Sequence, residues 1–244
     1  PYQVIRRSLY RLRKLRHLVN RLGNSINLIM YNFFIIHNIN SNMKICIHPN
    51  LLEAGIDEAG RGCLSGRVYS AAVILPNEFP DEGYLKIRDS KKLSKKMRNQ
   101  MRLYIEKHAI GYSVSYADVE EIDKYNILRA TLHSMTRAVD TLSPKPQHIA
   151  VDGNRFNIYM DDDDEIIAHT LVTGGDDKFR NIAAASILAK TYHDEYVQGL
   201  IRENPDLLKY GWDTNMCYGT KKHMDAIKKY GITKYHRKSF KPCQ

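Results

Sequence analysis

The sequence has 244 residues, of which 43% are hydrophobic and 26% are charged, and its formal net charge is +10. This is the composition of a globular chain with enough apolar residues to build a core. The apolar runs are shorter than the roughly 20 residues of a membrane-spanning helix, so we expect no membrane partner. The four cysteines form no C-x-x-C pair, which disfavours a zinc site or a disulfide framework and favours a reducing, cytoplasmic setting.

The positive charge is concentrated at the N-terminal end. Residues 1–52 hold eight of the 37 basic residues and no acidic one, so the remainder has 29 basic and 27 acidic residues. A nucleic-acid partner must therefore be argued from local patches. Residues 1–22 have the apolar spacing of a basic amphipathic helix. We interpret residues 1–50 as an N-terminal extension or disordered tail. On this interpretation, translation starts internally at Met43 and the residues before it are an upstream extension. A substrate-binding arm and a targeting leader in residues 1–42 stay open, and organellar targeting is not favoured.

After residue 50 the hydrophobic pattern predicts strands that alternate with helices. The expected strands are 51–57, 68–75, 111–116, 148–152 and 166–172. The expected helices are 95–108 with Ser94 as its N-cap, 127–142, 179–197 and 220–230. This order predicts an α/β fold with a sheet of about five strands and helices on its faces. We expect a main domain over 51–200, a helical C-terminal extension with a basic tail over 201–244, and a monomer.

Several acidic residues follow the predicted strands closely. Asp57 and Glu58 end the first, Asp152 ends the fourth, and Asp176 follows the fifth after two glycines. Gathered at one sheet edge, each pair would repel by about 4 kcal/mol at 4 Å and an effective dielectric of 20, so the group needs protons or cations. Oxygen ligands suit Mg²⁺ or Mn²⁺, and two such ions can hydrolyse a phosphodiester. Neighbouring strand residues point to opposite faces, so we expect the pleat to break between Asp57 and Gly60.

Local motifs around these acids carry a resemblance. They are, in order, Gly55-Ile56-Asp57-Glu58-Ala59-Gly60-Arg61-Gly62, Asp89-Ser90-Lys91-Lys92-Leu93-Ser94, Asn126-Ile127-Leu128 with Ala130-Thr131, Val151-Asp152-Gly153-Asn154, Gly175-Asp176, Ala183–Lys190, Tyr218-Gly219-Thr220 and His236-Arg237-Lys238-Ser239-Phe240. This ordered set resembles type 2 ribonuclease H (ribonuclease HII) from about residue 51 to residue 242. Residues 1–50 lie outside the resemblance.

The resemblance implies a fold, an activity and a set of catalytic residues. The implied fold is a ribonuclease-H-like mixed sheet of five strands with a helical C-terminal extension. The catalytic and metal-binding acids of the family match Asp57, Glu58, Asp152 and Asp176, with Mg²⁺ or Mn²⁺ in a two-metal site. The implied substrates are RNA–DNA hybrids and duplex DNA that contains ribonucleotides. Cleavage would fall on the 5′ side of a ribonucleotide and leave a 5′-phosphate and a 3′-hydroxyl.

Candidate substrate-binding residues come from the same motifs. Glycines allow a backbone to approach a sugar and phosphate closely, and by resemblance the loop Gly60-Arg61-Gly62 reads the ribose 2′-hydroxyl and the adjacent phosphate. Tyr218 matches the tyrosine that packs on the sugar at the RNA–DNA junction, where the 2′-hydroxyl distinguishes RNA from DNA. The further candidates are polar or basic and suited to phosphate contacts: Ser90, Lys91, Lys92, Asn154, Ser186 and Lys190.

Three residues depart from the family pattern. Gly174 stands where a lysine is common, Cys63 where a proline is common, and Cys217 where a glycine is common. The missing lysine puts phosphate binding or metal affinity near Asp176 in doubt. The alternatives are a type 3 ribonuclease H, a resolvase of the same superfold, and a catalytically inactive module that only binds nucleic acid. Arg61 and Tyr218 argue against type 3, and the four acids argue against the inactive module.

Overall fold

The computed structural model of the protein describes residues 43–244, and Met43–Gln244 form one compact unit. The basic helix predicted for residues 1–22 lies outside the described residues. Residues 43–50 contact the rest of this unit, because Lys44 N–H donates to the carbonyl of Lys178 and Lys44 O accepts from Arg180 N–H. The compact unit therefore begins at Met43, before the first strand.

One mixed sheet forms the centre of the molecule. Its strands are β1 (Glu53–Ala59), β2 (Val68–Ile74), β3 (Gly111–Ala117), β4 (His148–Asp152) and β7 (His169–Val172), in the order β3-β2-β1-β4-β7. β1, β2 and β3 pair antiparallel, whereas β4 pairs parallel with β1 and with β7. The predicted five-stranded α/β architecture is confirmed.

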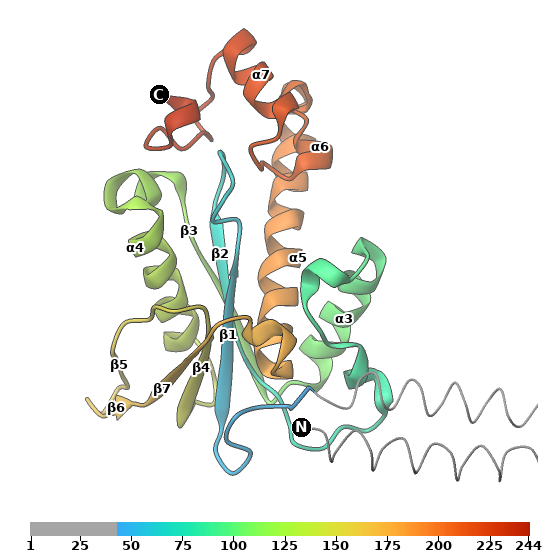
Figure 1. Ribbon diagram of the computed structural model, residues 1–244, viewed down its shortest axis with the longest axis vertical. Coiled ribbons are helices and arrows are strands. Elements are labelled where there is room, and N and C mark those ends of the chain that lie inside the picture. The colour runs from blue at the N-terminus through green and yellow to red at the C-terminus, as the bar shows by residue number, and fades with distance from the viewer. Residues whose placement is uncertain (1–42) are drawn as a thin grey trace, which may run out of the picture. The chain divides into compact units, whose positions relative to one another are not determined.

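Helices cover both faces of this sheet (Figure 1). On one face lie α3 (Lys95–His108) and the long α5 (Arg180–Glu203), and on the other lies α4 (Val119–Asp140). A Cβ atom at Gly55 would lie 2.2 Å from the Asn181 carbonyl carbon, so only glycine lets α5 approach β1 this closely. The close approach brings the N-terminal half of α5 against the strand that carries Asp57.

The predicted helices agree with the structure apart from two extensions, at the start of α4 and at the end of α5, which reaches Glu203 rather than residue 197. Ser94 caps α3 by accepting a hydrogen bond from Met97 N–H, as predicted. α4 begins at Val119 rather than residue 127, because a further helical turn precedes a kink at Asn126 (φ 69°). The Asn126 side chain accepts from the N–H groups of Leu128 and Arg129 and so caps the part of the helix that the sequence pattern predicted.

The strand predicted over 166–172 is wrong as a single element. Residues Ile166–Ile167 form β6, which pairs with β5 (Tyr159–Met160) in a separate two-stranded sheet, and only His169–Val172 join the main sheet as β7. The segment is mostly apolar on both sides of His169 and Thr170, but its two halves join different sheets.

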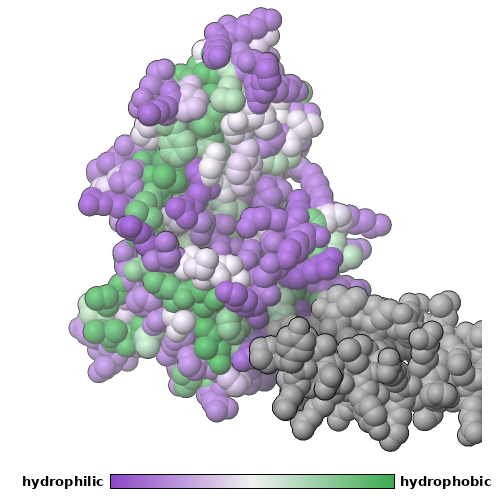
Figure 2. All heavy atoms as spheres, viewed as in Figure 1, coloured by the Kyte–Doolittle hydropathy of each residue, from purple (hydrophilic) through white to green (hydrophobic). Residues whose placement is uncertain are grey.

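The C-terminal region packs on the far end of α5. It contains α6 (Trp212–Asn215), α7 (Lys221–Tyr230) and short 3-10 turns, and its core includes Tyr210, Trp212 and Cys217 with Val197 of α5. Among residues 43–244, no helix combines the length and the apolar character that crossing a membrane requires. In the view of Figure 1, hydrophilic side chains gather across the middle of the face, over the region between α3 and α5 (Figure 2).

Candidate active site at the strand ends

Three aspartates meet at one edge of the sheet. β1 and β4 are parallel neighbours, so Asp57 near the end of β1 and Asp152 at the end of β4 lie at the same edge. Asp176 lies in the 3-10 turn Gly175–Asp177 that follows β7. One carboxylate oxygen from each of the three lies within 4.8 Å of the others. Residues separated by more than 100 positions in the sequence thus form one acidic cluster.

Glu58 lies beside this cluster rather than within it. The expected break in the pleat is absent, because pairing with β2 continues regularly from Asp57 to Ala59. The two acids therefore alternate in direction: Asp57 is hydrogen-bonded to Ser186 of α5, whereas Glu58 pairs with Arg61 at 3.1 Å. Burial raises the pKa of Glu58, Arg61 opposes this rise, and the charge of Asp152 adds to it, so Glu58 is still close to the cluster.

The acidic cluster is electrostatically strained. Burial raises the pKa of Asp57 well above its usual value, and the charges of Glu58 and Asp152 raise it further. Burial also raises the pKa of Asp176, again with a contribution from Asp152. Asp57 and Asp176 are only 4% and 6% exposed, so water screens these like charges poorly. A cation at this position would be strongly favoured.

Hydrogen bonds hold the acids in place. Gly175 N–H donates to Asp152 Oδ1 at 2.7 Å, which ties the end of β4 to the turn that carries Asp176. Ser186, which bonds Asp57, lies 2.9 Å from the buried hydroxyl of Ser90. Ser186 and Ser90 therefore form part of the support for Asp57.

Lysine side chains differ in how near they come to the acids. Lys91 Nζ lies 3.5 Å from Asp176 Oδ2 and places a positive charge at the rim. Lys92 instead binds the exposed Asp177 at 2.6 Å. Lys190 donates to Asp194 at 2.7 Å, and its ammonium lies 5.3 Å from the centre of the Tyr218 ring. Only Lys91 of these three directly faces the acidic cluster.

The glycine-rich loop and Tyr218 lie side by side. Cys63 pairs with Tyr218 in an antiparallel bridge, and a Cβ atom at Gly62 would lie 3.7 Å from the Tyr218 ring. Gly60 has a φ of +91°, and a Cβ there would lie 2.7 Å from the His193 ring, so the position requires glycine. Tyr218 is 37% exposed, and Arg61 is also exposed. Both side chains can reach a molecule bound beside Glu58.

Arg237 is a positioning residue that the sequence reasoning did not select. Its buried guanidinium donates to the carbonyls of Gly60, Arg61, Gly66 and Arg67 at 2.8–3.1 Å. These bonds fix both ends of the loop that carries Arg61. The only available signal was its place in the motif at 236–240, because its partners lie about 170 residues earlier in the chain.

Asn154 shows no comparable relation to the site. It is exposed in the turn after β4, two residues beyond Asp152. The structure therefore brings together the loop Gly60–Gly62, Tyr218 and the three aspartates, with Glu58 and Lys91 beside them.

The residues present fit divalent cations. The donors of the acidic cluster are carboxylate oxygens, which are the ligands of Mg²⁺ and Mn²⁺ rather than of thiophilic metals. A bound cation would also relieve the mutual repulsion of these carboxylates.

Comparison with known proteins agrees with this geometry. The family model described as ribonuclease HII matches residues 54–243. The ribonuclease HII of Bacteroides thetaiotaomicron is 52% identical over 194 residues, which cover 80% of this chain and 92% of that protein. The ribonuclease HII of Christiangramia forsetii has the same identity and the same coverage.

Solved structures show the same fold. The ribonuclease H2 of Pyrococcus horikoshii OT3 has a TM-score of 0.63 at 22% identity and covers 78% of this chain and 94% of its own. The structure of the PCNA:RNase HII complex from Archaeoglobus fulgidus gives 0.60 at 22%, with 78% and 96% covered. Bst-RNase HIII in complex with Mn²⁺ gives 0.60 at 18%, with 78% and 67% covered. The chain therefore belongs to the ribonuclease HII family, the endonucleases that act on RNA–DNA hybrids.

Proposed function

We propose that this chain cleaves the RNA strand of hybrids by two-metal phosphodiester hydrolysis, with Mg²⁺ or Mn²⁺, and that it also cuts 5′ of single ribonucleotides in duplex DNA. The products would carry a 5′-phosphate and a 3′-hydroxyl. The observation that supports this most is the meeting of Asp57, Asp152 and Asp176 within 4.8 Å.

The acids would hold the cations, and the surrounding residues would position the scissile phosphate. Divalent cations bound there would supply the positive charge that activates water and stabilises the leaving oxygen. Asp57, Asp152 and Asp176 are the ligands that we propose, with Glu58 completing the site from the neighbouring face of β1. Lys91, 3.5 Å from Asp176, offers a charge to a phosphate oxygen at the rim.

Recognition of a single ribonucleotide requires local reading of one 2′-hydroxyl. Duplex DNA with one ribonucleotide has little A-form geometry, so the overall helix shape cannot mark the site. We propose that the backbone of Gly60–Gly62 and the Arg61 guanidinium hold the ribose and its phosphate while the Tyr218 ring packs on the sugar. The Tyr218 ring lies 3.7 Å from where a Cβ atom of Gly62 would stand, and this proximity supports a shared pocket for one nucleotide.

Exposed lysines of the C-terminal region extend a basic surface beyond the catalytic centre. Lys221, Lys222, Lys228 and Lys229 of α7 are all exposed. We propose that this helix contacts phosphates of the duplex flanking the cut, which would make binding depend on salt concentration.

The test is an endonuclease assay on three labelled duplexes of the same sequence. One is all DNA, one contains a single ribonucleotide, and one is a continuous hybrid. With Mg²⁺ or Mn²⁺ we expect cleavage of the second and third, a single cut 5′ of the ribonucleotide in the second, and 5′-phosphate ends. Cutting of the hybrid alone would overturn the single-ribonucleotide activity, and binding without cleavage would identify an inactive module.

A further inference from the structure

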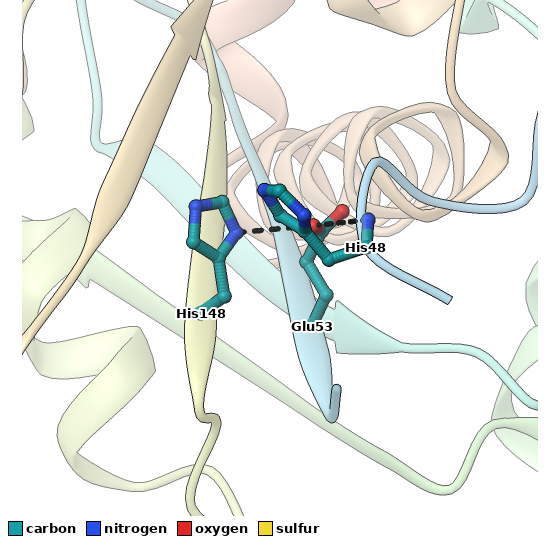
Figure 3. Close-up of side chains that lie close together, drawn as sticks. All are labelled: His48, Glu53 and His148. Atoms are coloured by element: carbon teal, nitrogen blue, oxygen red, sulfur yellow. Dashed lines mark hydrogen bonds and ion pairs between the residues drawn. The ribbon is translucent and has the colours of Figure 1, made fainter. Parts of the chain in front are cut away.

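A second group of potential metal ligands lies at the opposite end of β1 from the acidic cluster. Glu53 and His148 are directly paired residues at the starts of the parallel strands β1 and β4, and His48 precedes β1 (Figure 3). Glu53 and Asp57 are four positions apart in β1, which is about 13 Å along a strand. This histidine–glutamate group is therefore separate from the catalytic centre, and the proposed function does not use it.

The donor atoms of this group converge. One ligand atom from each of His48, Glu53 and His148 lies within 4.8 Å of the others. His148 Nδ1 lies 3.0 Å from Glu53 Oε2, and the two imidazole rings are 4.4 Å apart at their centres. An ion with bonds of about 2.0–2.2 Å can bind these donors once His148 Nδ1 and Glu53 Oε2 move slightly apart.

Neighbouring groups already orient the ligands. Thr170 Oγ1 lies 3.1 Å from His148 Nε2, the ring nitrogen that faces away from Glu53. Glu53 Oε1 accepts from Ile47 N–H and from Asn181 Nδ2 at 2.8 and 2.9 Å. Metal-binding histidines typically have a hydrogen-bonding partner on their second ring nitrogen, and metal-binding carboxylates are typically hydrogen-bonded as well.

Binding requires a change of tautomer at His148. In the metal-free state its Nδ1–H donates to Glu53. In the metal-bound state Nε2 carries the proton and donates it to Thr170 Oγ1. Nδ1 then has a free lone pair that can bind the ion. The hydroxyl can donate to one tautomer and accept from the other, so the ring need not rotate. The proton lost from Nδ1 is balanced by one taken up on Nε2, and the ring stays neutral.

We propose that His48, Glu53 and His148 form a site for one divalent transition-metal ion of the Zn²⁺ class. Two imidazoles and one carboxylate are a donor set that favours Zn²⁺, Co²⁺ or Ni²⁺ over Mg²⁺, in contrast to the oxygen donors of the acidic cluster. Glu53 and His148 are buried whereas His48 is exposed, so solvent can supply the remaining ligand. The bound ion would fasten the segment before β1 to the start of the sheet.

The experiment is calorimetric titration of the full chain with Zn²⁺. The catalytic ligands are first removed by combining Asp57→Asn with Asp152→Asn, because the acidic cluster can also bind Zn²⁺. The test variant adds His48→Ala, which keeps the buried pair of Glu53 and His148. The matched control adds His108→Ala at the end of α3 instead.

We expect one Zn²⁺ site in the parent and in the His108→Ala control, and an affinity at least about 100-fold lower with His48→Ala. Loss of outer-shell partners alone costs 10–100-fold, so loss of a ligand should cost no less. Co²⁺ should give visible absorption in the parent that His48→Ala abolishes. Equal Zn²⁺ affinity with and without His48, or no binding by the parent, would show that the group is only a hydrogen-bonded anchor. Either result leaves the hybrid-cleavage assay unaffected.

Discussion

The acidic cluster and the C-terminal polar core bury charged or titratable groups in opposite ways. At the strand ends, Asp57 and Asp176 are buried beside like charges, and both pKa values are raised. In the C-terminal region, His223, His236 and Arg237 are fully buried. We call these three residues, with Trp212, the C-terminal polar core. Its groups have complementary hydrogen-bonding partners, whereas Asp57 and Asp176 face mainly like charges, with Lys91 as a positive charge at the rim.

The hydrogen bonds of the C-terminal polar core define one pattern of protons. Trp212 Nε1–H donates to His223 Nε2 at 3.1 Å, so the proton of His223 is on Nδ1, which lies 3.1 Å from Tyr218 O. Thr233 N–H donates to His236 Nδ1 at 2.9 Å, so His236 carries its proton on Nε2 and donates it to His223 at 3.2 Å. With both imidazoles neutral, the single lone pair of His223 Nε2 is shared between two donors, Trp212 Nε1–H and His236 Nε2–H.

The comparison separates stability from function. Repulsion among the acids costs folding energy and creates affinity for cations, which is the usual compromise at a functional site. The C-terminal polar core contributes stability and holds the loop at Gly60–Gly62 and the backbone of Tyr218 where a substrate would contact them. Substitutions in the acidic cluster should therefore reduce cleavage without reducing stability, whereas substitutions in the C-terminal polar core should reduce stability.

The largest effect is expected from Asp152→Asn or Asp57→Asn. Loss of a metal ligand should remove several kcal/mol of transition-state stabilisation, a fall in cleavage rate on the order of 1,000-fold or more. Thermal unfolding without metal should hold or rise, because the change relieves like-charge repulsion. The control is Asp162→Asn, the same change at an exposed acid, which should cleave normally. Normal activity of either cluster variant would contradict the metal assignment.

Arg237→Met should give the opposite result, with a large loss of stability. It removes the guanidinium donor of four carbonyls, of which Gly60 O keeps a bond from Cys63 N–H, and we expect the free energy of unfolding to fall by about 3 kcal/mol or more. Arg237→Lys keeps the charge but lacks the planar fork, so it should lose less. Urea unfolding measures both. A stability unchanged in both variants would show that the guanidinium does not hold the loop.

Tyr218→Ala should impair catalysis without altering metal binding. A misplacement of about 1 Å can cost about 100-fold in rate, and we expect this loss on the single-ribonucleotide duplex. The loss should be smaller on a continuous hybrid, where other registers offer a 2′-hydroxyl. Tyr218→Phe keeps the ring and should lie between wild type and Tyr218→Ala. Equal rates for wild type and Tyr218→Ala on both substrates would limit Tyr218 to a structural role.

The smallest effect is a dependence of stability on pH. Burial and the neighbouring His223 lower the pKa of His236 to about 4, whereas the unfolded value is about 6.5. The unfolded chain thus binds a proton first, and stability falls as pH drops from about 6.5 towards 4. The contribution between pH 7.5 and 5 is about 2 kcal/mol. His236→Asn should be less stable at pH 7.5 and should flatten this slope in urea unfolding. An unchanged slope would contradict the assignment.

Local sequence patterns predicted most of the elements. Residues near one another in the chain determine the alternation in β2 and β3, the helical period of α3 and its cap at Ser94. These features can therefore be predicted without knowledge of the fold. The same holds for α7 (Lys221–Tyr230), which begins one residue after the predicted start at residue 220 because Thr220 is its N-cap. The largely apolar segment 166–172 was predicted as one strand, because its composition cannot show that its two halves join different sheets.

The sequence predicted the candidate site only in part. Motifs identified Asp57, Glu58, Asp152 and Asp176 by residue type and neighbours, but not the arrangement in which three aspartates share one point and Glu58 stands on the other face of β1. Arg237 belonged to the motif at 236–240, but nothing near it in the sequence indicated its partners. Its function depends on four carbonyls that the fold brings to it from the other end of the described chain.

By itself the sequence therefore determined which chemical groups this protein has and which short segments they occupy, because propensity, periodicity and capping act within a few residues. The tertiary structure alone decided which groups meet. Parallel pairing of β1 with β4 brings Asp57 to Asp152 and Glu53 to His148, and the contact of α5 with Gly55 adds Ser186. Electrostatic repulsion, burial and metal affinity depend on distances in space, and these arise only when strands far apart in sequence become neighbours.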